Sequence, residues 1–153
     1  MFSKNNIEDS LQVNIAVSTE LESKIQKWEQ MYRNNAEWIN DDVKSLELPS
    51  AIANEFVRLT MAEFKTNITG GARAKYIKNI YDYAIKELPN NLEYGNAKGG
   101  LIIKPYVKNG RIFVEFIQQG YFYPVEYDDT GKITSAIFVS QKVKGENIYT
   151  RLE

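Results

Sequence analysis

Apolar residues recur at helical spacing over the first two-thirds of the chain. The first such stripe consists of Leu21, Ile25, Trp28 and Tyr32. These positions share one face of a helix, because each lies about a whole number of turns from the last. Thr19 and Glu22 stand at the spacing of a capping box just before the stripe. The pattern predicts a helix over about 19–34.

Two further helices are expected downstream. Pro49 and Ser50 are residues that favour a helix start, and the apolar positions that follow cover more than one face, as in central or interface helices. We expect Phe56 on this helix, and Trp28 on the first one, to be buried. The residue pair Gly70-Gly71 then interrupts the pattern, and Pro89 interrupts the next. Helices are therefore predicted over about 49–66 and 72–88.

At Gly99-Gly100 the apolar period changes from helical to two, which is typical of strands. Asn109-Gly110 between two such runs indicates a two-residue type I′ hairpin. Turn-forming residues divide the rest into further strands, giving about five over 101–153. The prediction is an α+β fold, with about three helices followed by an antiparallel β-meander.

The domain organisation expected from these patterns is simple. Residues 1–18 are polar, and alternating apolar residues from Leu11 to Val17 favour an extended arm or short strand. Residues 19–153 form one α+β domain. Because the chain stops at Glu153 in or just after the fifth strand, we expect a piece of a longer protein. A natural terminus on a short edge strand is the alternative.

Composition removes many classes of function. The 153 residues include no Cys and no His, and the net charge is −1. Disulfide frameworks, zinc knuckles, thiol nucleophiles and His-dependent catalytic or metal sites are excluded. Tight phosphate binding is not expected without a basic excess. The apolar runs are too short to span a membrane and no signal peptide is recognisable. We expect a protein made in the cytoplasm that is not an enzyme.

Several short segments have compositions found in binding or catalytic sites. The glycines of 95–100 resemble a phosphate loop only loosely, because Leu101 stands where Lys is required; a helix C-cap and turn explain them better. The segment 70–73 is better explained as an interhelix turn than as an anion site. The acidic pairs 41–42 and 128–129 are typical of solvated turns. The aromatic segment 121–124 favours a core or a subunit interface over base stacking. No catalytic, cofactor-binding or metal-binding residue is assigned, and nucleic-acid-binding residues stay unassigned.

The order of short phrases along the chain carries a family resemblance. The phrases are KWEQMY (27–32), AEWI (36–39), VKSLELPSAIA (43–53), EFVRLT (55–60), ITGGARA (68–74), LEYGNAKGGL (92–101), IKPYV (103–107), FYP (122–124) and GKITSA (131–136). As an ordered set over roughly residues 20–153, they resemble the N-terminal region of bacteriophage portal proteins. The type is that of long-tailed phages and prophages of Gram-positive hosts.

The resemblance implies a structural role in the virion. Portal proteins form ring-shaped homo-oligomers at one vertex of the capsid. Their assembly takes place in the cytoplasm of the bacterial host. DNA passes through the ring without sequence-specific binding, and terminase, scaffold or capsid proteins and head-completion or tail proteins dock to it. Family members are roughly three times as long as this chain. The chain would then be the N-terminal part of the wing domain, with no cofactor and no membrane partner.

Two other hypotheses stay open at the level of the sequence. One is a self-contained protein-interaction module of a mobile element that binds its partner through the Tyr-rich sheet. The other is a carboxylate-dependent metal enzyme that uses the acidic turns, for which thermal melting with divalent cations is the test.

Overall fold

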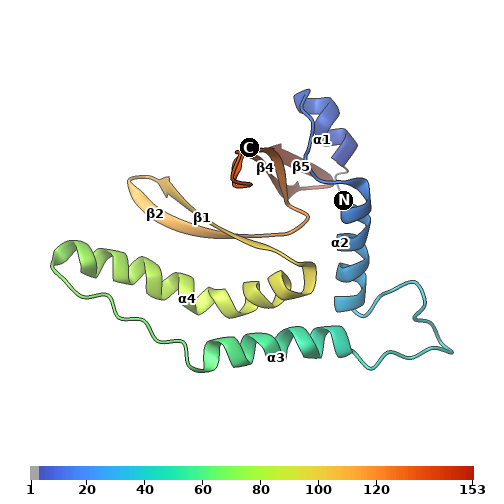
Figure 1. Ribbon diagram of the computed structural model, residues 1–153, viewed down its shortest axis with the longest axis horizontal. Coiled ribbons are helices and arrows are strands. Elements are labelled where there is room, and N and C mark those ends of the chain that lie inside the picture. Colours follow the sequence, from blue (N-terminus) through green and yellow to red (C-terminus); the bar gives the residue numbers. More distant parts are fainter. Residues whose placement is uncertain (1–3) are drawn as a thin grey trace. The chain divides into compact units, whose positions relative to one another are not determined.

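A computed structural model of the protein describes residues 4–153 (Figure 1). Within that range, four helices precede five strands. They are α1 (Lys4–Leu11), α2 (Thr19–Tyr32), α3 (Leu48–Ala62), α4 (Ala72–Lys98), β1 (Leu101–Lys108), β2 (Arg111–Gln118), β3 (Phe122–Tyr127), β4 (Ile133–Lys144) and β5 (Asn147–Leu152). The predicted α+β class with a C-terminal antiparallel meander is confirmed.

Each strand pairs with a sequence neighbour, but the strands form two sheets. In the first, β1 and β2 pair from Leu101 opposite Gln118 to Lys108 opposite Arg111. The connecting Asn109 and Gly110 have φ of 51° and 70°, as a type I′ turn requires, so the predicted hairpin is confirmed. The second sheet has the order β3-β4-β5, all antiparallel.

The chain separates into two compact units, where the sequence predicted one domain over 19–153. The terminal unit combines Met1–Gln26 with Gly120–Glu153, and the central unit is Lys27–Gln119. The division follows from the two sheets, because each sheet packs on different helical segments. Helix α2 begins in the terminal unit and ends in the central one.

The terminal unit shows why the predicted N-terminal arm is wrong in its first part. Residues 4–11 form helix α1, whose Ile7 is fully buried. The alternation expected up to Val17 does hold after the helix, since Ile15 and Val17 are buried and the Ala16 N–H donates to the Pro124 carbonyl at 2.8 Å. The core of this unit comprises Ile7, Ile15, Val17, Tyr123, Ile137 and Val139.

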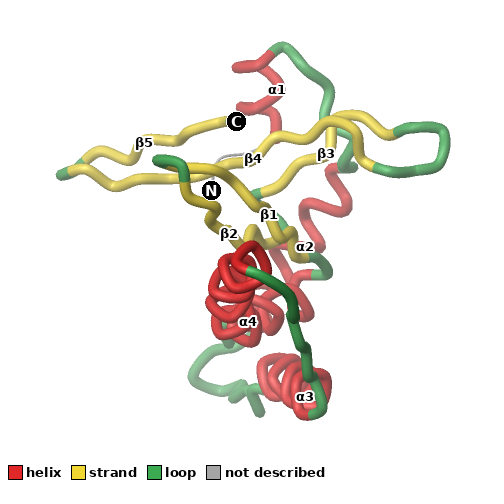
Figure 2. Tube along the Cα trace, turned by 90° about the vertical axis from the view of Figure 1, so that its left-hand side faces the viewer, coloured by secondary structure: helices red, strands yellow, loops and turns green. Residues whose placement is uncertain are grey.

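The central unit has a layered arrangement around α4. Helix α3 lies along one side of α4 and the β1–β2 hairpin lies along the other, as both views show (Figures 1 and 2). The two layers contact α4 through different faces of that helix. This arrangement leaves one side of α3 and part of the hairpin without a packing partner among the described residues of the unit.

Helix α4 is longer than predicted because it continues through Pro89. The expected end at residue 88 is wrong; the helix runs to Lys98. Proline removes one backbone donor from the helix, and nearby the Asn91 side-chain amide donates to the Glu87 carbonyl at 2.8 Å. The helix ends at Gly99, which has φ of 84° and donates its N–H to the Gly95 carbonyl at 2.9 Å. The predicted glycine C-cap is thereby confirmed.

Two aromatic residues expected in the core are partly exposed. Phe56 is 59% exposed and Trp28 is 37% exposed. Helix α3 instead buries the smaller Ala53 and Val57 against its neighbours. Helix α3 does carry apolar residues on more than one face, as predicted. Its fully buried residues, Ala53 and Val57, lie on only one of these faces.

Candidate functional site

A buried ion pair lies at the C-terminal end of α4, inside the central unit. The Lys98 side chain is fully buried, and its Nζ lies 3.1 Å from Glu29 Oε2 on α2. The same ammonium donates to Gln118 Oε1 on β2 at 3.1 Å and lies 6.0 Å from the Tyr94 ring centroid. A buried ammonium requires such compensation, because its loss of hydration is costly. Lys98 therefore ties together α2, α4 and the hairpin.

The electrostatics of this pair favour the charged state of Glu29. Burial alone would raise the pKa of the Glu29 carboxyl, but hydrogen bonds and charge from Lys98 and Arg33 outweigh burial and lower that pKa. Arg33 Nε donates to Glu29 Oε1 at 2.9 Å. A carboxylate held ionised by two cations is poorly suited to act as a general acid or base near neutral pH. The arrangement fits a structural link.

A second polar link connects α2, α3 and α4 close by. The Tyr32 hydroxyl donates to Glu93 Oε1 at 2.8 Å, and the Asn54 amide donates to Glu93 Oε2 at 3.1 Å. Tyr32 also packs edge-on against Tyr94 with ring centroids 5.2 Å apart. Burial, followed by the neighbouring Glu93 carboxylate, raises the pKa of Tyr32 above its usual range. Tyr32 therefore stays neutral and acts as a fixed donor.

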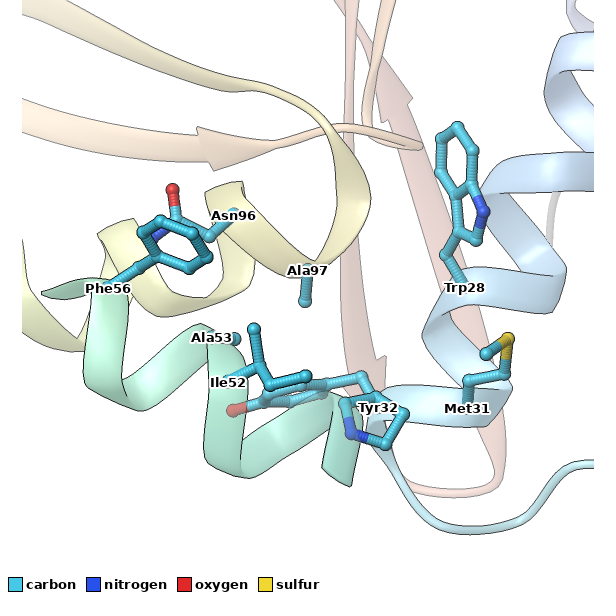
Figure 3. A pocket seen from close by; sticks show the side chains of 9 residues that line it. Trp28, Met31, Tyr32, Ile52, Ala53, Phe56, Asn96 and Ala97 are labelled. Carbon is cyan, nitrogen blue, oxygen red and sulfur yellow. The ribbon is translucent and has the colours of Figure 1, made fainter. Parts of the chain in front are cut away.

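An apolar hollow of about 210 Å³ opens beside these links, between α2, α3 and α4 (Figure 3). Figure 3 shows Ile52 and Phe56 of α3 on one side and Trp28 and Met31 of α2 on the other. Asn96 is the one amide side chain among the residues that line it. With no carboxylate, ammonium or guanidinium in its lining, the hollow suits an apolar side chain better than a charged substrate.

A larger apolar groove of about 310 Å³ lies between α4 and the hairpin. Its lining consists of apolar residues of α4 and of both hairpin strands, together with Tyr81. The α4 stripe contributes Ile77, Ala84 and Leu88, and the hairpin contributes Ile103, Val114 and Phe116. Ile77 and Ile103 are still 48% and 55% exposed. The hairpin therefore covers α4 incompletely, and the groove is a candidate binding surface of the central unit.

The glycines of 70–71 and 95–100 have backbone roles in the interhelix turn and at the C-terminal end of α4. Gly95 lies inside α4, and a Cβ added there would meet the Leu101 Cβ at 2.9 Å, so glycine permits close packing of β1. Gly71 is the N-cap of α4 and Gly70 has φ of 138° in the preceding turn. The positions of Gly70 and Gly71 agree with the predicted interhelix turn, whereas the close packing at Gly95 was not predicted.

The two acidic pairs occupy turns in different units. Asp128 Oδ1 accepts from the Thr130 N–H at 2.8 Å, the Thr130 hydroxyl at 2.7 Å and the Lys132 N–H at 2.9 Å. Hydrogen bonds from Thr130 and Lys132 lower the pKa of Asp128. Asp41 is exposed. Among residues 4–153, no three Asp, Glu, His or Cys side chains lie close enough together to hold a metal ion.

The aromatic segment 121–124 packs inside the terminal unit. Phe122 and Tyr123 are 7% and 4% exposed, and Phe122 contacts Phe138 with ring centroids 5.6 Å apart. Burial, with smaller effects from Glu22 and Tyr121, raises the pKa of Tyr123 to about 12. The interpretation as core packing is confirmed for these two residues, and a stacking platform for bases is not available on them.

The sequence did not indicate the Lys98 pair. Glu29 and Lys98 are far apart in the chain, and a lysine before two glycines is ordinary at a helix end. The groove, in contrast, had a signal in the sequence, because apolar residues recur at helical spacing over 77–88 and alternate over 112–116. In residues 4–153 no helix combines the length and apolar character needed to cross a bilayer.

Comparison with known proteins adds no identification. No family model matches the chain, and neither a curated protein nor a solved structure is found to be similar to it.

Proposed function

We propose that this chain is part of a bacteriophage portal subunit, contributing the N-terminal portion of the wing domain. In that role it belongs to a ring at one capsid vertex through which DNA is packaged and ejected. Terminase, scaffold or capsid proteins and head-completion or tail proteins dock to such a ring. The chain itself performs no catalysis and needs no cofactor.

The observation that carries the proposal is the ordered set of portal-like phrases over roughly residues 20–153. Most of these phrases lie in the central unit, where they form the end of α2, α3, both ends of α4 and strand β1. Most of the phrases therefore belong to one compact unit.

The exposed apolar residues and the low net charge of the chain are consistent with a subunit of an oligomer through which DNA moves. Large apolar side chains are exposed on α3, on α4 and on the hairpin, and contiguous exposed apolar surface is typical of interaction sites. The net charge of −1 suits a subunit of a channel protein, since a strongly basic protein would retain DNA through its phosphates.

Immunoelectron microscopy of phage particles tests the proposal directly. Antibodies raised against residues 1–153 should label virions at the single vertex where head meets tail, and should label assembling heads in the host cytoplasm at one vertex. Label spread over the whole shell, or particles without any label, would contradict the proposal.

The runner-up is a protein-interaction module of a mobile element, and the apolar groove beside α4 is the observation that favours it. A groove of this kind suits an apolar helix of a partner. The module would be monomeric and would stay so at high concentration. Sedimentation of the complete gene product separates the two candidates, because a portal subunit forms a large closed oligomer.

A further inference from the structure

The fold brings together basic residues that are scattered along the sequence. The start of α4 and the tip of the β1–β2 hairpin each contain basic residues and no Asp or Glu; the basic residues are Arg73, Lys75, Lys78, Lys108 and Arg111. The two segments are adjacent in space, because the Ile112 N–H donates to the Tyr76 hydroxyl at 3.3 Å. Lys78 is paired with Asp82. One end of the central unit is therefore basic, in a chain whose net charge is −1.

Exposed aromatic rings lie beside these cations, on the face of the hairpin that points away from α4. The hairpin residues that line the groove beside α4 include Pro105 and Ile112, and successive residues of a strand point to opposite faces. Tyr106 and Phe113 therefore belong to the other face, where they are register partners. Their rings are stacked with centroids 5.7 Å apart, and the two residues are 38% and 41% exposed.

Two cations lie directly opposite each other on this outer face. Lys108 and Arg111 are register partners at the hairpin turn, next to the aromatic pair. Like charges at directly opposite positions destabilise a strand pair. The acidic residue of this face is Glu115, which lies beyond the aromatic pair and opposite Lys104. The tip of the hairpin therefore carries a positive charge that an anionic group of another molecule would compensate.

Cations beside exposed aromatic rings are the combination that binds single-stranded nucleic acid, because phosphates contact the cations and unpaired bases stack on the rings. Successive side chains on one face of a strand are about 7 Å apart. A base that stacks on Phe113 would thus place its phosphate near Arg111. A duplex hides the faces of its bases, and an acidic peptide would use the cations without the rings. The arrangement therefore favours an unpaired strand.

We propose that the outer face of the β1–β2 hairpin binds single-stranded DNA or RNA. Lys108 and Arg111 contact phosphates, and Tyr106 and Phe113 stack against bases. The binding is tolerant of sequence, because every base has a face that can stack. It is weak and depends on salt, because few phosphates are neutralised. The inference goes beyond the portal role and does not depend on it.

Fluorescence anisotropy tests the proposal, with a labelled oligo(dT) of about 15 nucleotides titrated with the 153-residue chain. The double variant Lys108→Gln with Arg111→Gln should bind at least about fivefold more weakly, because phosphate contacts are lost. It should still fold, because the pair that it removes is repulsive. Phe113→Leu keeps the charge and should also bind about fivefold more weakly, because a stacking surface is lost.

The matched control is the double variant Lys142→Gln with Lys144→Gln. It removes the same charge from the β4–β5 hairpin, where both lysines are exposed. The affinity for oligo(dT) should change by less than about twofold, because these lysines lie outside the proposed site. Circular dichroism confirms that each variant is folded. Equal losses of affinity from the two double variants would overturn the assigned surface.

Competition experiments decide the class of the partner. Unlabelled oligo(dT) should displace the labelled strand, whereas a duplex of the same length and a poly-Glu peptide should displace it poorly. A duplex that competes equally would contradict base stacking, and poly-Glu that competes equally would point to an acidic protein segment instead. No binding at about 0.1 mM protein in low salt would also overturn the proposal. None of these outcomes decides whether the complete gene product forms rings, so the portal proposal is tested separately.

Discussion

At the scale of single residues, Lys98 is the most constrained side chain of the central unit. Its ammonium is fully buried and is compensated by Glu29 and Gln118. Glu29 keeps 18% of its side chain exposed and also binds Arg33. Breaking the pair therefore affects the two partners differently. Glu29 can still contact water, whereas the Lys98 ammonium would be left buried without water.

Replacement of Lys98 by Ala should lower the free energy of unfolding by about 3 kcal/mol, because it breaks a buried ion pair and leaves a cavity. The double variant Lys98→Met with Glu29→Gln should lose less than half as much, because neither charge is then left without its partner. Urea unfolding of the two variants checks this. A double variant as unstable as Lys98→Ala would show that the charges themselves, and not their pairing, stabilise the fold.

The lowered pKa of Glu29 gives a pH dependence with a defined sign. The folded state holds this carboxyl below its ordinary value of 4.5, so the stabilisation is complete above pH 4.5 and is lost as the pH falls through the folded-state pKa. The difference in unfolding free energy between wild type and Glu29→Gln should shrink from about pH 7 to about pH 3. A difference that stays constant over this range would contradict the assignment of the shift to the Lys98 and Arg33 contacts.

At the scale of elements, local signals in the sequence were sufficient to predict the hairpin and the central parts of the longer helices. Alternating residues and the Asn109-Gly110 pair locate β1 and β2, because both turn residues need positive φ. The end of α4 was not predictable, because Pro89 is a local signal to stop and the packing of 90–98 overrides it. The N-terminal helix α1 has a single buried apolar residue, too few to reveal a helical period.

The hairpin turn provides a test at this scale. Gly110 has φ of 70°, and a Cβ added there meets nothing within 4 Å. Gly110→Ala should therefore cost about 1–2 kcal/mol from backbone conformation alone. Gly110→Asn is the matched control and should cost less, because Asn tolerates this region. Thermal or urea unfolding measures both; equal costs for the two variants would contradict a left-handed turn as the cause.

The burial of individual helix faces could not be read from the sequence. Helix α3 has apolar residues on several faces, and the sequence alone does not say which face is covered within the chain. The structure covers Ala53 and Val57 and leaves Phe56 exposed. The aromatic residues of 121–124 were more predictable, because strand alternation limits the choice to two faces.

At the scale of the whole molecule, the division into two units has a consequence for folding. The central unit is one continuous segment, Lys27–Gln119, whereas the terminal unit needs both ends of the chain. The two sheets are separate. The contacts that hold each unit are therefore satisfied within that unit.

The isolated segment 27–119 should fold by itself. It retains α3, α4, the hairpin and the Lys98 pair, together with the end of α2 that carries Glu29. Circular dichroism should show a helical spectrum and a cooperative melting transition. The same segment with Lys98→Ala should melt at a lower temperature. A segment without a cooperative transition would show that the terminal unit is required for the central one.

We propose that this chain belongs to a portal ring. Negative-stain electron microscopy of the complete product of the gene that encodes it tests this claim most directly. The account predicts closed rings with a central channel. Discrete small particles without a channel at every protein concentration would contradict the portal assignment and favour the interaction module.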